Sequence, residues 1–196
     1  MFQGDKFNLL CDKLPESVKV DGVDYPIFTA FRDWISFFNL HEDNTLRNKE
    51  KIMIAMNWYK GDKPENIIAA YSALQEFAEC SELPKDKKSK TGASNTPVFS
   101  YLHDNLYLFS DFMRYYNVNL QKEKNMHWYI FKSLFEGLPE ESSVKKRIAY
   151  RSINTSDIKD KNERMRIIKI KNSIKIPTDN ITANEIGNIF WNMGGE

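Results

Sequence analysis

Apolar residues recur along this chain at two different periods, and the two periods predict different elements. Over residues 17–27 apolar and polar side chains alternate on both sides of Asp21 and Gly22, a pair that favours a tight two-residue turn. This segment is therefore predicted to be a β-hairpin, with Pro26 marking its second strand as an edge strand. Because an isolated hairpin is only marginally stable in water, we expect it to lie against the helices that follow.

Four later segments repeat apolar residues every three or four positions, which predicts amphipathic helices. Short polar side chains favour helix starts, so the first helix is expected to begin at Thr29, the second at Asn44 or Thr45 and the third at Asp62. The fourth is predicted over residues 98–116. Its narrow apolar stripe suits packing against another helix and comprises Phe99, Leu102, Leu106, Phe109, Met113 and Tyr116.

The stretch over residues 125–172 predicts three consecutive helices. The first carries an apolar stripe of Trp128, Phe131, Leu134, Phe135 and Leu138. Pro139 ends it, because proline cannot continue the hydrogen bonds of a helix interior. A short second helix follows, and then a basic third helix whose start is indicated by Asp160 and Glu163.

Together these segments predict a mainly α protein, α+β at most, built as a compact bundle of about seven helices with one N-terminal β-hairpin. Residues 1–176 are predicted to form a single helical domain. Residues 84–97 carry lysines and small polar residues, which is typical of a mobile basic surface loop. Residues 177–196 are predicted to form a C-terminal appendix, with a helix that begins at a capping box of Thr182 and Glu185. That helix either covers the core of its own chain or docks on another subunit.

Composition supports a folded protein and restricts its surroundings. Of 196 residues, 41% are hydrophobic and 13% aromatic, a load that argues against wholesale disorder. The net charge is +1, so overall electrostatics predict no polyanionic partner. Two cysteines far apart, Cys11 and Cys80, indicate a reducing compartment. No signal-peptide pattern and no apolar run of roughly 20 residues occurs, which predicts a cytoplasmic protein with no membrane partner.

The residues that usually carry chemistry are present but not clustered. His41, His103 and His127 share no metal-ligand spacing, and His127 is best interpreted as a packing histidine at a helix start. The glycines are scattered, so no phosphate-binding loop is predicted. We therefore expect a protein that is not an enzyme and has no catalytic residue, metal or cofactor. A small hydrolase with an unfamiliar site stays a distant alternative.

The basic helix is the strongest candidate for contact with a partner. From Lys159 to Lys175 there are seven basic residues and two acidic ones, together with several isoleucines. One interpretation is phosphate contact with nucleic acid; the favoured one is an amphipathic helix whose isoleucines pack and whose charges face water or an acidic partner. The candidate partner-binding residues are Ile167, Lys169, Ile170 and Ile174 from this helix, and Ile186, Ile189, Phe190 and Met193 from the last helix.

Several of these segments resemble a known phage family. They are VDGVDYPIxTxFRDWIxF over residues 20–37, HWYIFKSLFEGLPE over residues 127–140, YRS over residues 150–152 and IKDKNER over residues 158–164. The aromatic helix near residues 99–120, with Asp104 and Tyr116, is similar as well. In these motifs the chain resembles the gene product fifteen family, from the tail-morphogenesis region of siphophages that infect Gram-positive bacteria. The chain continues past the point at which members of that family often end.

The resemblance implies a tail assembly chaperone that acts in the cytoplasm of the infected host. Such a protein binds the long tape measure protein and helps recruit tail tube subunits without remaining in the virion. Its expected partners are thus the tape measure protein, the tail tube protein and further copies of itself. The alternative from a different class is a nucleic-acid-binding phage regulator that uses the basic helix over residues 159–175.

Overall fold

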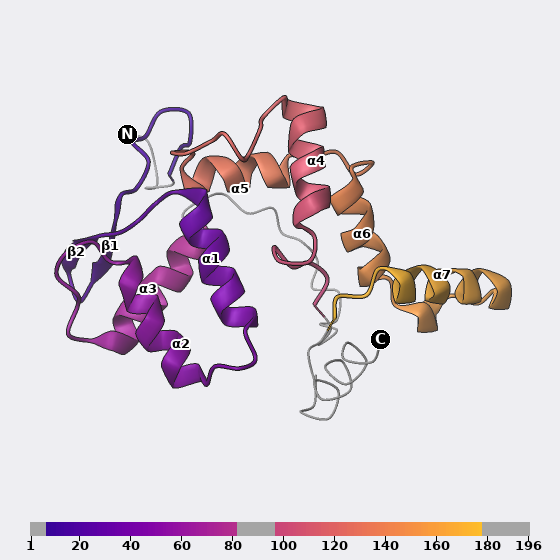
Figure 1. Cartoon of the computed structure of the whole chain (residues 1–196), viewed down its shortest axis with the longest axis horizontal. Coiled ribbons are helices and arrows are strands. Elements are labelled where there is room, and N and C mark those ends of the chain that lie inside the picture. The colour runs from indigo at the N-terminus through magenta and orange to yellow at the C-terminus, as the bar shows by residue number, and fades with distance from the viewer. Residues whose placement is uncertain (1–6, 82–96, 178–196) are drawn as a thin grey trace, which may run out of the picture.

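The computed structural model describes residues 7–81 and 97–177, where the chain is mainly helical with one two-stranded antiparallel sheet (Figure 1). The predicted fold class is confirmed. The elements are β1 (Ser17–Val20), β2 (Val23–Pro26), α1 (Phe31–Glu42), α2 (Asn48–Ala55), the 3-10 turn η1 (Met56–Trp58), α3 (Ile67–Ala78), α4 (Asn105–Tyr116), α5 (Trp128–Glu136), α6 (Ser143–Ser152), the 3-10 turn η2 (Thr155–Asp157) and α7 (Lys161–Ser173). Apart from its last residue, Pro97, the loop predicted at 84–97 lies outside the described residues. So does the predicted appendix beyond Pro177.

The hairpin turns at the two residues predicted from the sequence. Asp21 and Gly22 both have positive φ, 49° and 86°, as a tight turn of this kind requires. Beside the turn, Val20 pairs with Val23. Val18 and Val20 are buried on the side that packs against α3, whereas Val23 is exposed. The hairpin therefore covers α3 with one face only.

α1 begins one residue later than predicted, because its start is fixed by a distant segment. Its N-cap is Ala30, which makes no side-chain cap. The carbonyl of Thr29 instead accepts a hydrogen bond from the Trp128 amide at 2.8 Å, and the Phe31 amide donates to the Met126 carbonyl at 2.9 Å. These two bonds join the start of α1 to the start of α5.

The predicted start of α2 was also wrong. Neither Asn44 nor Thr45 caps this helix. The carboxylate of Asp43 accepts hydrogen bonds from the amide and hydroxyl of Thr45 at 2.8 and 2.6 Å, which forms a turn ahead of the helix. The N-cap is Arg47, whose amide donates to the carboxylate of Glu50 at 2.8 Å. The start of α2 is thus stabilised by the side chain of Glu50, the third residue of the helix, and not by a short polar side chain at the N-cap.

α3 starts after Asn66, not after Asp62 as predicted. The side-chain oxygen of Asn66 accepts a hydrogen bond from the Ala69 amide at 3.2 Å, and its amide nitrogen donates to the Asp21 carboxylate at 3.0 Å. Pro64, expected in the first turn, lies before the helix. The cap thereby ties the start of α3 to the hairpin turn.

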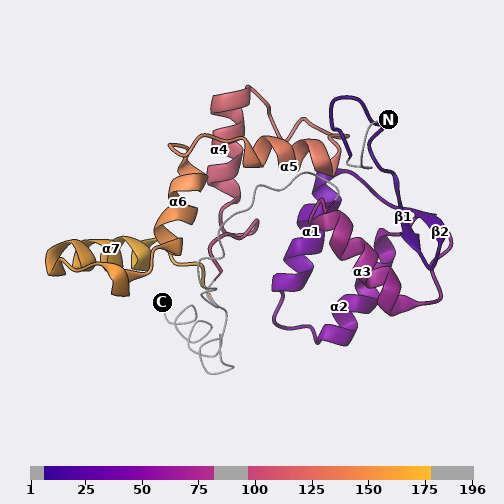
Figure 2. The ribbon, with the colours of Figure 1, turned by 180° about the vertical axis from the view of Figure 1, so that it is seen from behind.

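α5 lies between the N-terminal helices and the pair formed by α4 and α6 (Figures 1 and 2). Its predicted stripe is confirmed as core, since Trp128 and Phe131 are fully buried. The Trp128 ring lies 6.4 Å from Trp34 on α1, and Phe131 stacks on Phe31 at 5.0 Å and on Phe112 at 5.2 Å. These aromatic side chains therefore form one continuous core through α1, α5 and α4.

α4 is shorter than the predicted 98–116 helix, and its predicted stripe is divided between two sides. Phe99, Phe109 and Tyr116 pack against the core. Leu102 and Leu106 are 54% and 67% exposed. Leu108, Asp111 and Phe112 face the core instead. The predicted packing face was therefore right in part: three of its six residues contact the core, and the centre of the inner face is formed by Leu108, Phe112 and an aspartate.

The stretch over residues 125–172 forms α5, α6 and α7 in the predicted order. Asp160 is confirmed as the N-cap of the basic helix α7, since its carboxylate accepts a hydrogen bond from the Glu163 amide at 2.7 Å. Figures 1 and 2 show α7 projecting sideways from the rest of the described chain, next to the end of α6. The basic helix is therefore peripheral.

Candidate functional site

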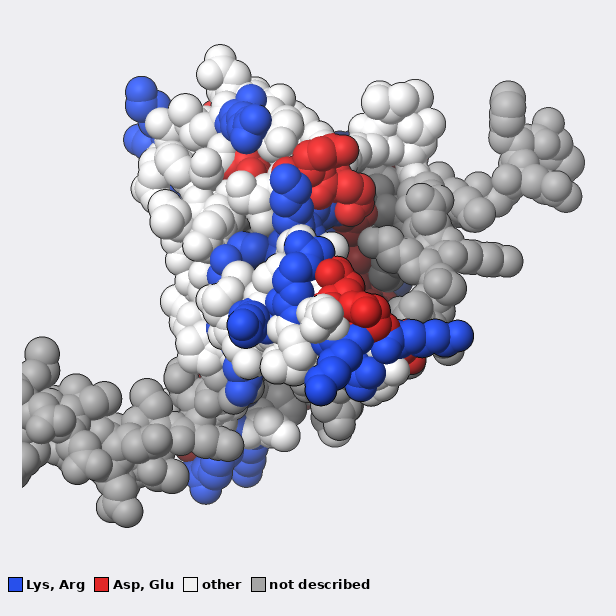
Figure 3. Space-filling view, turned by 90° about the vertical axis from the view of Figure 1, so that its right-hand side faces the viewer, with Lys and Arg blue, Asp and Glu red and all other residues white. Residues whose placement is uncertain are grey.

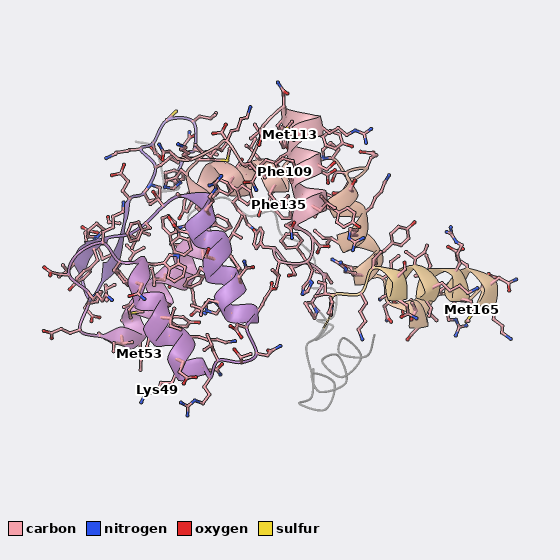
Figure 4. All side chains as sticks on the ribbon, viewed as in Figure 1. Lys49, Met53, Phe109, Met113, Phe135 and Met165 are labelled. Carbon is pink, nitrogen blue, oxygen red and sulfur yellow. The ribbon has the colours of Figure 1, made fainter. Side chains whose placement is uncertain are left out.

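Among the described residues, three exposed apolar side chains lie along α4 and the turn before it. We define the α4 outer face as Leu102, Leu106 and Met113, with Phe109, which also packs against the core, at its edge. Leu102, Leu106 and Met113 are 54%, 67% and 39% exposed, and Phe109 is half-buried. Phe109 and Met113 lie one above the other along α4 (Figure 4). Within α4, helical spacing places Leu106, Phe109 and Met113 on one side, and Leu102 lies in the turn that precedes the helix. Such a row matches the contact surface of a second amphipathic helix.

The opposite side of α4 is held by a buried ion pair. Asp104, at the N-cap of α4, is fully buried, and its carboxylate accepts hydrogen bonds from both terminal nitrogens of Arg151 at 2.6 and 2.9 Å. Arg147 Nε donates to the same carboxylate at 3.0 Å. Arg147 and Arg151 lie one turn apart on α6, so a single carboxylate fixes α4 against α6.

Burial alone would raise the pKa of Asp104, because it disfavours the ionised form. Hydrogen bonds from Arg151 and Arg147 and the positive charge of Arg151 outweigh burial, so the pKa of Asp104 lies below its ordinary value. The carboxylate is therefore ionised in the folded protein at neutral pH. The guanidinium of Arg147 also lies over the ring of Tyr107, 4.0 Å from its centroid.

A second buried carboxylate on α4 caps α6. Asp111 accepts hydrogen bonds from the amides of Ser143 and Val144 at 3.0 and 2.8 Å. These amides belong to the first turn of α6, where backbone donors have no partner within the helix. The negative charge is also favoured there by the helix dipole. Two carboxylates thus orient α4 so that its apolar row faces outward.

Arg151 also joins two distant parts of the backbone. Its Nη1 donates to the Val98 carbonyl at 3.0 Å, and its Nε donates to the Ile174 carbonyl at 2.7 Å. Val98 precedes α4, and Ile174 follows the last residue of α7. The guanidinium group of Arg151 therefore contacts both the segment that leads into α4 and the residue that follows α7.

The predicted partner-binding residues on α7 lie on two sides of that helix. Ile167 is buried, and Ile170 and Ile174 are half-buried on the side toward the rest of the chain. Lys169 is exposed. The other four predicted residues, Ile186, Ile189, Phe190 and Met193, lie outside the described residues. Their role in binding a partner stays a prediction.

Some of the charge on α7 is used within the chain. Arg166 donates two hydrogen bonds, each 2.8 Å long, to the carboxylate of Glu163, and Lys171 donates to the Ile153 carbonyl. Figure 3 shows Lys and Arg side chains on this end of the molecule with groups of acidic residues between them. The surface is therefore one of mixed charge, which favours solvation over a continuous phosphate track.

The three histidines occupy structural positions. His127 is the N-cap of α5: its Nδ1 accepts from the Tyr129 amide at 3.1 Å and its Nε2 donates to the Pro15 carbonyl at 2.9 Å. Burial lowers the pKa of His127, so the neutral ring is favoured. His41 bonds the Phe37 carbonyl through Nδ1.

His103 lies in the turn before α4, where its backbone amide donates to the Ser100 hydroxyl at 3.2 Å. Within residues 7–81 and 97–177, no group of three or more His, Cys, Asp or Glu residues is arranged to hold a metal ion.

Two surface hollows, of about 450 and 270 Å³, lie in the N-terminal part. The larger is lined by the hairpin, α3 and Tyr129. The smaller is lined by His41, Lys51 and Tyr71 among others. Lys51 Nζ donates to the His41 carbonyl at 2.7 Å, and the Tyr71 hydroxyl bonds the His41 ring. These polar groups hold α1, α2 and α3 together.

Sequence reasoning missed Asp104, Asp111, Arg147 and Arg151. Asp104 and Arg151 both fall in segments that carry the family resemblance, yet their pairing across 47 positions left no periodic signal. The available hint was a carboxylate inside an otherwise apolar helical pattern. Such a carboxylate is normally predicted to face solvent unless the group that binds it is known.

The fold and its surfaces describe a small helical protein with a hairpin, an outward apolar row and a peripheral basic helix. The chain belongs to the Bacteriophage Gp15 protein family, whose model matches residues 10–176. Searches of curated proteins and of solved structures gave no match. No helix among the described residues is long and apolar enough to cross a membrane.

Proposed function

We propose that this phage protein is a tail assembly chaperone. It binds the tape measure protein in the host cytoplasm, helps recruit tail tube subunits, acts without catalysis and is absent from the finished virion. The observation that carries the proposal is the α4 outer face in a protein of this family. A long helical client offers rows of apolar residues at the same spacing, which an exposed helix row can cover.

The charge of α4 supports such a client. Both aspartates of this segment, Asp104 and Asp111, are buried in contacts with α6, and Arg114 is exposed. The outer face therefore presents apolar groups without an exposed carboxylate from its own helix. A partner helix flanked by acidic residues would therefore meet no exposed carboxylate of α4 itself.

Co-expression tests the proposal directly. The tape measure protein should become soluble with this chain and co-purify with it. Leu106→Asp should reduce that soluble fraction and weaken binding at least tenfold, because it places a charge inside the apolar contact. The matched control is Ile68→Asp on α3, where the isoleucine is 79% exposed and lies away from α4. Equal rescue by Leu106→Asp and Ile68→Asp would remove the α4 outer face from the proposal.

Failure of rescue by the unaltered chain would reject the chaperone function as a whole. A gel shift that weakens steeply with salt would favour the nucleic-acid alternative, since phosphate contacts release counterions. Exchange of Lys161 and Lys169 on α7 for glutamate should abolish that shift and leave tape measure binding unchanged.

A further inference from the structure

We propose that the C-terminal residues 182–193 dock on the α4 outer face of their own chain. The sequence predicts a helix there with Ile186, Ile189, Phe190 and Met193 on one side. The α4 outer face offers a row of the same spacing. Both rows are apolar, so contact between them would remove apolar surface of each from water.

The position of the chain end supports an intramolecular contact. Because Arg151 binds both the Asp104 carboxylate and the Ile174 carbonyl, Ile174 lies near the start of α4, three residues before the described chain ends. The four residues 178–181 can span up to about 14 Å. A helix of 12 residues is about 18 Å long, which is also the length of α4. The C-terminal segment can therefore begin beside the first residues of α4 and lie along the length of that helix.

Charge favours the same pairing. Residues 178–196 contain Asp179, Glu185 and Glu196 and no Lys or Arg. The outer face of α4 has no exposed carboxylate from that helix, and Arg114 is exposed in the last turn of α4. A negatively charged segment meets no like charge on this helix. The family match ends at residue 176, so the family model does not cover this segment.

Hydrogen exchange of the full-length chain, without any client, tests this contact. Amides in residues 186–193 should exchange at least about tenfold more slowly in the unaltered chain than in Leu106→Asp or Met113→Asp. Both substitutions are at exposed positions, so the fold should be retained. Ile68→Asp is the matched control and should leave the protection unchanged.

Three outcomes overturn the inference. The amides of residues 186–193 could exchange at the rate of an unfolded peptide, which means that the segment docks nowhere. Protection that increases with protein concentration assigns the segment to a second copy. Protection that survives Leu106→Asp but is lost in Met165→Asp assigns it to the exposed side of α7, where Met165 lies (Figure 4).

One consequence rests on the proposed function, and its test is separate. A client that binds the α4 outer face has to displace the C-terminal segment, so Phe190→Asp should strengthen tape measure binding several-fold. If exchange shows the segment docked but Phe190→Asp leaves binding unchanged, the client uses another surface and the intramolecular contact still holds. If no client binds at all, the proposed function fails while the exchange result is unaffected.

Discussion

Asp104 on α4 and Arg151 on α6 form a bidentate ion pair, with nitrogen–oxygen distances of 2.6 and 2.9 Å and almost no exposure to water. The same guanidinium binds the backbone on both sides, at Val98 and Ile174. Nearly all of its donor capacity is used. This pair therefore sets the position of α4, of the segment before it and of the end of α7 at once.

Asp104→Asn should destabilise the fold by about 3 kcal/mol, because it leaves two guanidinium groups near a buried site without their counter-charge. Urea unfolding followed by circular dichroism measures the change. Glu163→Gln is the matched control, since Glu163 makes a similar bidentate contact with Arg166 at the surface. That exposed pair should shift the unfolding midpoint little. Similar losses in both variants would show that burial of the pair is unimportant.

Stability should fall as the pH drops from 7.5 to 5.5, and His127 should be a cause. Burial holds the pKa of folded His127 below its ordinary 6.5. The unfolded chain therefore binds more protons in this range, and acid favours unfolding. His127→Asn keeps a side chain able to cap α5 but removes the titration. Its free energy of unfolding should change less over the same pH range, as measured by urea unfolding at each pH. An unaltered pH dependence in the variant would assign the effect to other groups.

Asp111→Ala should destabilise the protein by about 2 kcal/mol, because two amides at the start of α6 lose a charged acceptor in a buried position. Exchange of the Ser143 and Val144 amides should increase with it. Ser142→Ala is a milder comparison, because the Ser142 hydroxyl accepts only one long hydrogen bond, 3.4 Å from the Lys145 amide. If the Ser142 change proved the more damaging, Asp111 would not be the main cap.

Thiol labelling should distinguish the two cysteines. Cys11 is exposed, whereas Cys80 is buried at 2% exposure. A colourless aromatic disulfide reagent should modify one thiol per chain within the mixing time, and the second only at the rate of unfolding. Cys11→Ser removes the fast phase and provides the control. Two fast equivalents in the unaltered chain would contradict the buried position of Cys80.

Local pattern was a good guide where the inner face of an element is apolar. The stripe of Trp128 and Phe131 was correctly predicted to be core, and so were the hairpin turn and the Asp160 cap. α4 shows where such reasoning fails. Its inner face carries Asp111, whose partners are amides more than 30 positions away. The predicted stripe is therefore only partly buried: Phe109 packs against the core, whereas Leu106 and Met113 are exposed.

Helix starts failed for a related reason. Thr29 has the residue type of an N-cap, but its carbonyl is bound by an amide of α5, and the helix begins at the residue that this contact allows. Partner faces were harder still. An exposed row of apolar residues and a buried one share the same spacing, and only the position of neighbouring helices separates them.

The bridge between the starts of α1 and α5 has a consequence for the order of folding. The Trp128 ring contacts Trp34 and Phe38 on α1, so α1 lacks these core contacts until α5 has been made. Domains fold during synthesis as their parts become available. The N-terminal helices should therefore stay open to proteases and chaperones while the ribosome translates the intervening segment. The fold can then be completed only after the ribosome has synthesised α5.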